Sequence, residues 1–179
     1  MEIKNNVLEK VYDIDIKKET FEIPDNVNII KNGCCSNLNK LKKIIISKDI
    51  EKIERYAFDT CIGLKEVEIL NENCKMDYAI FCNCLSLEKI ILPQKIEKLE
   101  TALFWNCKQL KNIQIPNTVI SIGIHTFYNC LSLEEILIPN NVKILTISSF
   151  LNCKNLKKIH WKNKIYSYND LVEYGEFKE

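Results

Sequence analysis

The hydrophobic positions of this chain repeat every 23 residues. Phenylalanine and cysteine show the repeat most clearly, because five copies of each keep the spacing and each cysteine lies three residues after a phenylalanine. The two columns are Phe58, Phe81, Phe104, Phe127 and Phe150, and Cys61, Cys84, Cys107, Cys130 and Cys153. A fixed period of about 20 to 50 residues indicates a solenoid, in which each turn buries its apolar side against its neighbours.

Further apolar columns predict where the strands lie. In one repeat Leu87 is followed by Ile90 and Leu92, and the other repeats have the same apolar pattern. The last two positions are separated by one outward position, which is the spacing of a β-strand. Parallel strands stacked side by side are therefore predicted at residues 42–46, 66–70, 89–93, 112–116, 135–139 and 158–161.

The rest of each repeat is predicted from the residues that follow the strand. Proline ends several strands, because it lacks the backbone donor that a ladder needs. Beyond it, apolar residues such as Val119 and Ile122 predict a second short strand or extended run, and the stretch from phenylalanine to cysteine predicts a short helical turn. One repeat departs from the pattern at Asn73 and Met76, where we expect a local distortion that Cys74 helps to fill.

The chain is predicted to form one solenoid domain over residues 1–179, with repeats over residues 20–162. Residues 1–19 are expected to be an N-terminal strand cap, because the stretch from Val7 to Ile16 contains a period of two. Such a cap would cover a core edge that would otherwise aggregate. Residues 163–179 are expected to be the C-terminal cap.

The C-terminal cap is predicted to be a short helix. Ser167, Asn169 or Asp170 can cap its first turn through the side chain. The helix is expected to continue through Leu171 to Phe177 and to lay its apolar side over the last repeat.

Charge and hydropathy exclude several kinds of partner. Lysine and arginine number 25 against 24 acidic residues, so the net charge of +1 provides no field to attract nucleic acid or an anionic membrane. No window approaches the roughly 18 apolar residues of a membrane span, and the first residues lack the apolar stretch of a secretory signal. From the sequence as given, we expect no nucleic-acid partner, no membrane insertion and a cytoplasmic location.

The nine cysteines are predicted to be reduced thiols, mostly in the core. Their number is odd, and five of them lie on the repeat column. Buried cysteine behaves as a small hydrophobe, which suits a narrow repeated position. Parallel turns also point the Cβ vectors in the same direction, which is poor geometry for a disulfide. We expect no disulfide within the column.

No catalytic or metal site is predicted. The two histidines, His125 and His160, fall in different columns and hence on different faces, so neither is expected to serve a cysteine nucleophile as its base. The pairs Cys34–Cys35 and Cys82–Cys84 lack the spacing of a structural zinc site, and no glycine-rich phosphate loop is present. We therefore expect a non-enzymatic protein with no cofactor and no metal.

The repeat unit L-x-x-I-x-I-P-x-x-V-x-x-I-x-x-x-x-F-x-N-C resembles the BspA-like class of leucine-rich repeat over about residues 20 to 162. That class has the same repeat length, the IP and V-x-x-I steps and an aromatic residue before the cysteine. This chain departs from it in keeping the glycine after the V-x-x-I step only at Gly123, and the alanine before the phenylalanine only at Ala57.

The resemblance implies a mainly β, right-handed leucine-rich-repeat-like coil with a parallel sheet on one side. It implies no catalytic residues. The best-known members are surface proteins of bacteria and parasitic protists that bind host or partner proteins. The resemblance therefore implies a binding surface and, as an alternative to the cytoplasm, the cell surface; fold alone does not fix either.

The outward positions of the predicted strands are the first candidate surface. One column alternates in charge at Lys43, Glu66 and Lys89, which stabilises a sheet and keeps it soluble. Exposed aliphatic residues beside it are candidates for an apolar strip that binds a partner. They are Ile45, Leu70, Ile91 and Leu137. Single exposed aliphatic residues are also common on proteins without such a role.

Aromatic residues after the phenylalanine column are the second candidate surface. Trp105 and Tyr128 follow it in adjacent repeats, and aromatic pairs are enriched at protein interfaces. The alternative is that both rings lie back over the turns and are partly buried. The asparagines before the column cysteines, at Asn83, Asn106, Asn129 and Asn152, are expected to hydrogen-bond the main chain and to be partly buried.

Two functions remain after these exclusions. The first is a protein–protein interaction module, adhesin-like or a scaffold, that binds a protein partner through the exposed face of the repeat sheet. The alternative is a structural spacer or rod with no ligand on the sheet. A concave apolar strip would favour binding, whereas a fully charged strand face would favour the spacer.

Overall fold

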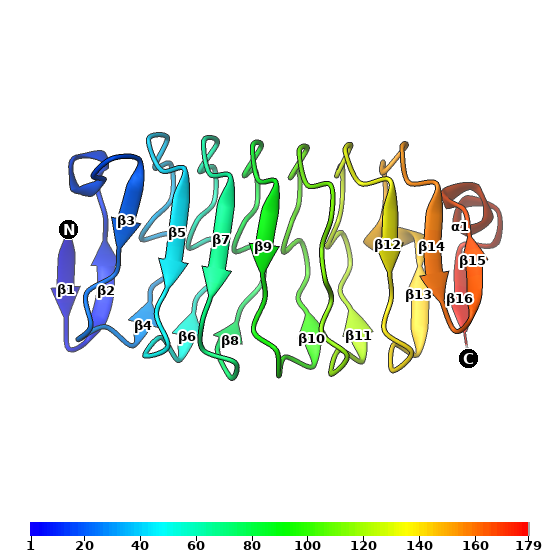
Figure 1. Ribbon diagram of the computed structural model, residues 1–179, viewed down its shortest axis with the longest axis horizontal. Coiled ribbons are helices and arrows are strands. Elements are labelled where there is room, and N and C mark those ends of the chain that lie inside the picture. The colour runs from blue at the N-terminus through cyan, green and yellow to red at the C-terminus, as the bar shows by residue number, and fades with distance from the viewer. Residues whose placement is uncertain (179) are drawn as a thin grey trace.

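The computed structural model describes residues 1–178, and the chain winds into a β-solenoid of about seven turns (Figure 1). Most turns contribute a strand to a front sheet and a short strand to the back. One helix lies near the C-terminus (Figure 1). The solenoid with a parallel sheet, predicted from the 23-residue period, is confirmed, as is the leucine-rich-repeat-like coil that the resemblance implied.

The front sheet keeps the register of the repeat. Lys43 pairs with Glu66, and Glu66 pairs with Lys89, so equivalent residues of successive turns lie side by side. The first part of the sheet contains four parallel strands: β3 (Thr20–Glu22), β5 (Lys43–Ile46), β7 (Glu66–Ile69) and β9 (Lys89–Ile91). The last part contains β12 (Glu135–Leu137) and β14 (Lys158–Trp161) in parallel, with β15 (Lys164–Tyr166) added antiparallel.

The front sheet is interrupted between β9 and β12. A strand was predicted at residues 112–116, but Figure 1 draws no arrow there, and no strand pairing joins this segment to either neighbour within the described chain. Ile113 and Ile115 still point into the core. The apolar pattern therefore predicted the inward positions correctly and the backbone pairing incorrectly, because burial of side chains does not require a ladder.

Short strands form the back of the solenoid, as the second apolar segment of each repeat predicted. They are β4 (Ile29–Ile30), β6 (Lys52–Ile53), β8 (Lys75–Met76), β10 (Lys98–Leu99), β11 (Ser121–Ile122) and β13 (Ile144–Thr146). The divergent repeat keeps its register, since Met76 pairs with Ile53. Cys74 is buried in the core beside it, and the expected distortion of this strand is not found.

The N-terminal residues form a hairpin of β1 (Glu2–Lys4) and β2 (Val7–Lys10), and β2 pairs in parallel with β4. The predicted strand from Val7 to Ile16 was wrong beyond β2, because a 3-10 helix, η1 (Asp13–Asp15), follows. The Asp15 carboxylate accepts the Tyr12 N–H at 2.9 Å and closes this turn. As a result Ile14 is 87% exposed instead of facing the core.

The C-terminal residues form the helix α1 (Tyr168–Tyr174) and a strand, β16 (Glu176–Lys178). Ser167 caps the helix as predicted: its hydroxyl accepts the Asp170 N–H at 3.2 Å, and the Asp170 carboxylate accepts the Ser167 N–H at 2.6 Å. The helix was expected to reach Phe177. It ends instead at Gly175, whose φ of 74° stops the helix, and β16 pairs antiparallel with β13.

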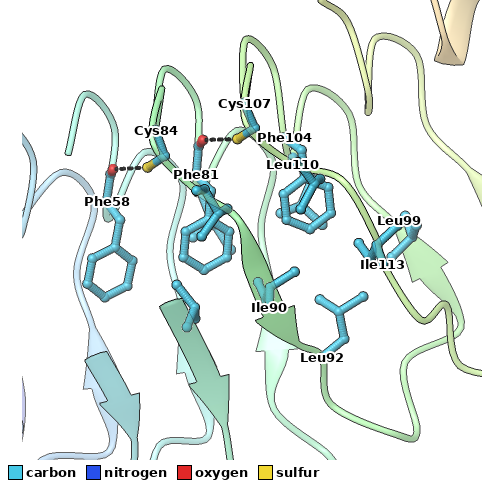
Figure 2. Close-up of a cluster of buried hydrophobic side chains, with 14 of the residues drawn as sticks. Phe58, Phe81, Cys84, Ile90, Leu92, Leu99, Phe104, Cys107, Leu110 and Ile113 are labelled. Atoms are coloured by element: carbon cyan, nitrogen blue, oxygen red, sulfur yellow. Dashed lines mark hydrogen bonds between the residues drawn. The ribbon is translucent and has the colours of Figure 1, made fainter. Parts of the chain in front are cut away.

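The phenylalanine column forms the centre of the core. Its rings stack face to face from turn to turn, with centroids 5.3 to 6.0 Å apart, and every ring is fully buried. Figure 2 shows Phe58, Phe81 and Phe104 in this arrangement, with the column thiols above them. Each thiol donates to a carbonyl of the preceding turn, for example Cys107 to Phe81 at 3.2 Å.

At the corner that contains the cysteines, the stretch from each column phenylalanine to its cysteine is a turn, not the predicted short helix, and the 3-10 segment η2 (Ile147–Ser149) lies before Phe150. Two residues of most corners take a left-handed conformation, such as Ala102 and Asn106 with φ of 54° and 63°. Asparagine adopts this conformation more readily than most residues. The corner asparagines were expected to bond the main chain, but they bond one another: Asn106 donates to Asn83 at 3.0 Å, and the ladder continues to Asn152.

Candidate interaction surfaces

The outward side of the front strands, here called the sheet face, carries aliphatic side chains where the register predicted them. Ile45 and Ile91 are 42% and 40% exposed, and Leu70 is also exposed. Glu68 lies between Ile45 and Ile91 in the pairing. The aliphatic residues of β5 and β9 are therefore separated and do not form a continuous strip.

Ion pairs surround these aliphatic residues. The Lys43 ammonium lies 3.0 Å from the Glu66 carboxylate, and its hydrogen bond lowers the pKa of the Glu66 carboxyl. Lys65 and Glu88 form a longer pair at 3.9 Å. These exposed pairs contribute little to stability, but they make the N-terminal half of the sheet face charged and well hydrated.

The C-terminal half of the sheet face is more apolar. Leu137, His160 and Ile165 lie in one row across β12, β14 and β15. Leu137 is 70% exposed and Ile165 is 64% exposed. Their strand neighbours Ile136 and Ile159 point into the core, which fixes the outward direction of the row. Ile165 was not predicted as a site residue, because it belongs to the antiparallel hairpin and not to a repeat column.

A charged residue borders this row on one side. The His160 Nε2 atom lies 2.7 Å from a carboxylate oxygen of Glu135, which pairs with Lys158 at 3.8 Å. On the other side Leu137, His160, Trp161 and Ile165 line a hollow of about 380 Å³. The row therefore has the composition of a small apolar patch with a polar rim.

Aromatic side chains gather beside the phenylalanine column. Trp105 and Tyr128 stack with centroids 4.3 Å apart, as their adjacent positions suggested, and both are half-buried. His125 joins them, at 5.1 Å from Trp105 and 5.7 Å from Tyr128. The contribution of His125 was missed, because it lies two residues before its phenylalanine whereas the other two lie one residue after theirs.

A second aromatic cluster was missed altogether. Tyr56 and Tyr78 pack edge to face at 5.5 Å, and Arg55 donates to the Tyr78 hydroxyl at 3.1 Å. Arg55 and Tyr78 are one repeat apart, a spacing that could have shown their contact. Tyr56 and His125 occupy equivalent positions three repeats apart, so both clusters lie on one flank, here called the aromatic side.

The sequence profile of the BspA type leucine-rich repeat region, in six copies, matches residues 5–101 and 74–172. The chain belongs to this family. A search of curated protein sequences finds no match.

Solved structures agree with the family. A leucine-rich repeat protein from Bacteroides ovatus is 27% identical, with a TM-score of 0.69, over 78% of this chain and 36% of that one. The pneumococcal vaccine antigen PcpA is 26% identical, with a TM-score of 0.61, over 75% and 34%. A leucine rich cell surface protein from Faecalibacterium prausnitzii shares the fold at 24% identity and a TM-score of 0.67, over 86% and 50%. The BspA-type chain therefore spans between a third and half of these proteins.

The buried thiols of this BspA-type solenoid are expected to be unreactive. Burial raises the pKa of the Cys61 thiol to about 12, and it raises the pKa of Cys84 and Cys107 well above the ordinary value. A thiol must ionise to attack an electrophile or bind a metal. The column cysteines are thus neutral donors to the main chain and make poor nucleophiles.

The BspA-type chain shows no arrangement typical of a catalytic or metal centre among residues 1–178. No group of three or more His, Cys, Asp and Glu side chains in this range is placed to hold a metal ion. His125 lies on the aromatic side, whereas His160 lies on the sheet face. No helix in the described part of the chain is both long and apolar enough to cross a membrane. Repeat proteins of this family are generally non-enzymatic.

Proposed function

We propose that this chain is a non-enzymatic module that binds a protein partner through its sheet face, in an adhesin-like or scaffolding role. The observation that carries the proposal is the row of Leu137, His160 and Ile165, in which two aliphatic side chains on paired strands are about two-thirds exposed to solvent. Membership of the leucine-rich repeat family supports an interaction module of this kind.

The rigidity of the paired strands favours binding at this row. Leu137 and Ile165 are held apart by a defined strand register, so they lose little conformational freedom when a partner covers them. Burying a leucine or isoleucine side chain is worth about 1.5–3 kcal/mol. Ile91 and Ile45 would extend the contact toward the N-terminus, with the ion pairs around them as a polar rim that favours one orientation.

The spacer function remains the second candidate, and one observation favours it. The N-terminal half of the sheet face is crossed by exposed ion pairs, including Lys43 with Glu66 and Lys65 with Glu88. A charged, hydrated strand face is what a rod without a ligand would carry. The two functions therefore differ in whether the aliphatic residues of the sheet face are used.

The aromatic side is an alternative surface for the same interaction function. It contains tryptophan, tyrosine and the single arginine of the chain, which are the residue types that most often carry binding energy at interfaces. Trp105 and Tyr128 stack mainly on each other, however, so part of each ring is already covered. For this reason we propose the sheet face first.

Quantitative affinity capture from a native lysate tests the proposal. The bait proteins are the wild type, Ile91→Glu, Leu137→Glu and, as a control, Ile14→Glu, which changes a more exposed aliphatic residue outside the front strands. We expect a partner that is captured by the wild type and Ile14→Glu and is lost from the two sheet-face variants. Equal capture by all four would remove the sheet face, and Tyr78→Ala and Trp105→Ala would then test the aromatic side.

A further inference from the structure

A pair of backbone hydrogen bonds recurs at the start of each front strand and then stops. The amides of Lys65 and Glu66 both donate to the carbonyl of Lys42, and the amides of Glu88 and Lys89 both donate to that of Lys65. The same pair joins the turns at Lys42 with Glu19 and at Lys157 with Glu134. Within residues 1–178 it is missing at the two steps on either side of Lys111.

The segment 111–115 makes no backbone hydrogen bond to any described residue. Its neighbours β9 and β12 pair only with the strands on their far sides. Ile113 and Ile115 nevertheless remain almost completely buried. The segment is therefore attached to the solenoid by its apolar side chains and not by its main chain.

Hollows mark both sides of this segment. One of about 580 Å³ is bounded by Ile90 and Ile91 of β9 and by Asn112 and Gln114 of the segment. Another, of about 430 Å³, lies between Asn112 and the residues around Glu134 and Glu135. The main chain of residues 111–115 thus has room to move on each side, and water can reach its unpaired groups.

The corner of the same turns is closed. Phe104 donates its N–H to Thr126 at 2.9 Å and stacks on Phe127 at 5.7 Å. Cys130 donates to the carbonyl of Phe104 at 3.4 Å, and the asparagine ladder runs on through Asn129. These turns therefore lack backbone hydrogen bonds at the front but remain bonded and stacked at the corner.

The back of the solenoid shows which of the two junctions between turns, the one before or the one after residues 111–115, is held by fewer hydrogen bonds. Each junction is called a step here. The step from the turn of β9 to the turn of residues 111–115 is still joined at the back by the pairing of β10 with β11. The next step has no such pairing, because β11 and β13 belong to different sheets. Away from the corner it is crossed by single bonds, such as that from Ser132 N–H to the Lys108 carbonyl at 3.0 Å. We expect the larger motion between residues 111–122 and 135–146.

The outward side chains of the segment differ from those of the paired strands. Elsewhere equivalent positions form cross-strand ion pairs, as Lys43 does with Glu66 and Lys158 with Glu135. At the same position the segment has Asn112, and beyond it Gln114. Asparagine is depleted in strands, and neither side chain offers the branched surface that favours strand pairing.

We propose that residues 111–115 form a hinge that divides the sheet face into two rigid parts. Ile45 and Ile91 lie on the first part, while Leu137 and Ile165 lie on the second. Motion at the hinge changes the angle between these two aliphatic groups. We further propose that this motion fits the sheet face to a protein partner, and that part rests on the proposed function. The hinge itself requires no partner.

Amide hydrogen exchange and ¹⁵N relaxation on the free full-length chain test the hinge. We expect the amides of Asn112 to Ile115 to exchange at least about 100-fold faster than those of Ile44 to Ile46, because unpaired amides need no opening before exchange. Their order parameters should lie below the value of about 0.85 of a rigid backbone. Amides of the corner, such as those of Phe104 and Asn129, should remain protected.

Two results would overturn the hinge. Protection of residues 112–115 equal to that of β5 would show a continuous sheet in solution. Rapid exchange with order parameters equal to those of β5 and no ¹⁵N relaxation dispersion in residues 112–115 would show a fixed gap without motion. Because neither measurement involves a partner, failure of the hinge is distinguishable from loss of partner capture in the sheet-face variants.

A designed variant tests the cause. Asn112→Thr combined with Gln114→Val supplies β-branched residues and should slow exchange of residues 112–115 by at least about tenfold, since strand formation then requires local opening. Glu68→Val is the matched control, because it places a β-branched residue at an outward position of the already paired strand β7. Unchanged exchange in the double variant would contradict the role assigned to the two side chains.

Discussion

The Cys84 thiol donates a hydrogen bond to the Phe58 carbonyl at 3.2 Å, across one turn of the solenoid (Figure 2). Cys61 and Cys153 donate in the same way at 3.0 and 2.8 Å. The Phe58 carbonyl also accepts the Cys61 N–H at 3.3 Å, so the small, neutral thiol fills the corner and gives this buried carbonyl a second donor. The protonation state of these cysteines is therefore coupled to folding.

Alkaline pH should destabilise the protein through these thiols. Cys61 titrates near pH 9 when unfolded and at about 12 when folded, because burial disfavours the thiolate. Above pH 9 the unfolded chain binds fewer protons than the folded one. The contribution of the Cys61 thiol to the free energy of unfolding therefore falls as pH rises toward 12. Between pH 10 and 12 the expected slope from one such thiol is about 1.4 kcal/mol per pH unit.

Urea denaturation at several pH values measures this slope. Cys61→Ser is the control, because serine can still donate to the Cys35 carbonyl but does not ionise in this range. The variant should show a shallower decline than the wild type above pH 9. Parallel declines would mean that other groups account for the alkaline loss.

Thiol reagents should distinguish the folded and unfolded states. Eight of the nine cysteines are buried, and Cys82 is only partly covered. At pH 8 the native protein should react slowly and first at Cys82, whereas protein denatured without reductant should yield nine free thiols. A markedly lower number in the denatured sample would contradict the prediction that no disulfide forms within the column.

Core and surface substitutions should differ sharply in their effect on stability. Phe104→Ala removes a ring stacked on both sides and should lower the free energy of unfolding by about 3–5 kcal/mol. Ile91→Glu lies on the sheet face and should change it by no more than about 0.5 kcal/mol. Denaturant unfolding of both variants decides the point, and a large loss in Ile91→Glu would show that this side chain has a structural role.

Substitutions at Asn106 should distinguish the contribution of the asparagine ladder to stability from that of the backbone conformation. Asn106→Gly removes two hydrogen bonds between side-chain amides, worth about 0.5–1.5 kcal/mol each, but glycine tolerates the φ of 63°. Asn106→Ala loses the same bonds and adds about 1–2 kcal/mol for a left-handed residue with a Cβ atom. Thermal unfolding should rank wild type above glycine and glycine above alanine. Equal stability of the two variants would show that the backbone conformation costs little here.

Gly123 should not tolerate a side chain. A Cβ atom there would lie 2.6 Å from the Thr101 nitrogen and 2.8 Å from the Glu100 carbonyl carbon, and both are main-chain atoms that cannot rotate away. Gly123→Ala is expected to lose about 1–3 kcal/mol through overpacking. Gly175→Ala is the comparison, because its Cβ would meet open space and only its φ of 74° opposes the change. The contrary result is a smaller loss at Gly123 than at Gly175.

The repeat columns were predictable because they depend on burial, which a period reveals directly. Phe81 and Leu87 lie in the core as their spacing indicated, and Ile91 points outward from the neighbouring strand position. Backbone pairing was less predictable. Nothing in the apolar pattern distinguishes Ile113 from Ile90, yet one lies outside any strand and the other lies in β9. We attribute the difference to the outward side chains Asn112 and Gln114, which a search for core positions ignores.

The surface clusters were the hardest to predict. Trp105 and Tyr128 share a column, so their contact followed from the period. His125 reaches the same ring from a different column, and its approach depends on the shape of the corner turn. Ile165 required knowledge that the chain reverses after β14. The positions of His125 and Ile165 both depend on the path of the main chain outside the repeat columns. A sequence period does not predict that path.

The asparagine ladder also has a direction. Every amide donates toward the N-terminal side, from Asn152 through Asn129 to Asn83, and Asn83 donates to the carboxylate of Asp59 at 3.2 Å. The amide dipoles are therefore aligned head to tail along the solenoid axis, and their positive ends point toward an anion. Chains of this kind polarise one another, and a negative charge at the positive end is stabilising. The corner thus acts as a polarised row that Asp59 terminates, so a single neutral break in its middle would separate the charge from the dipoles behind it.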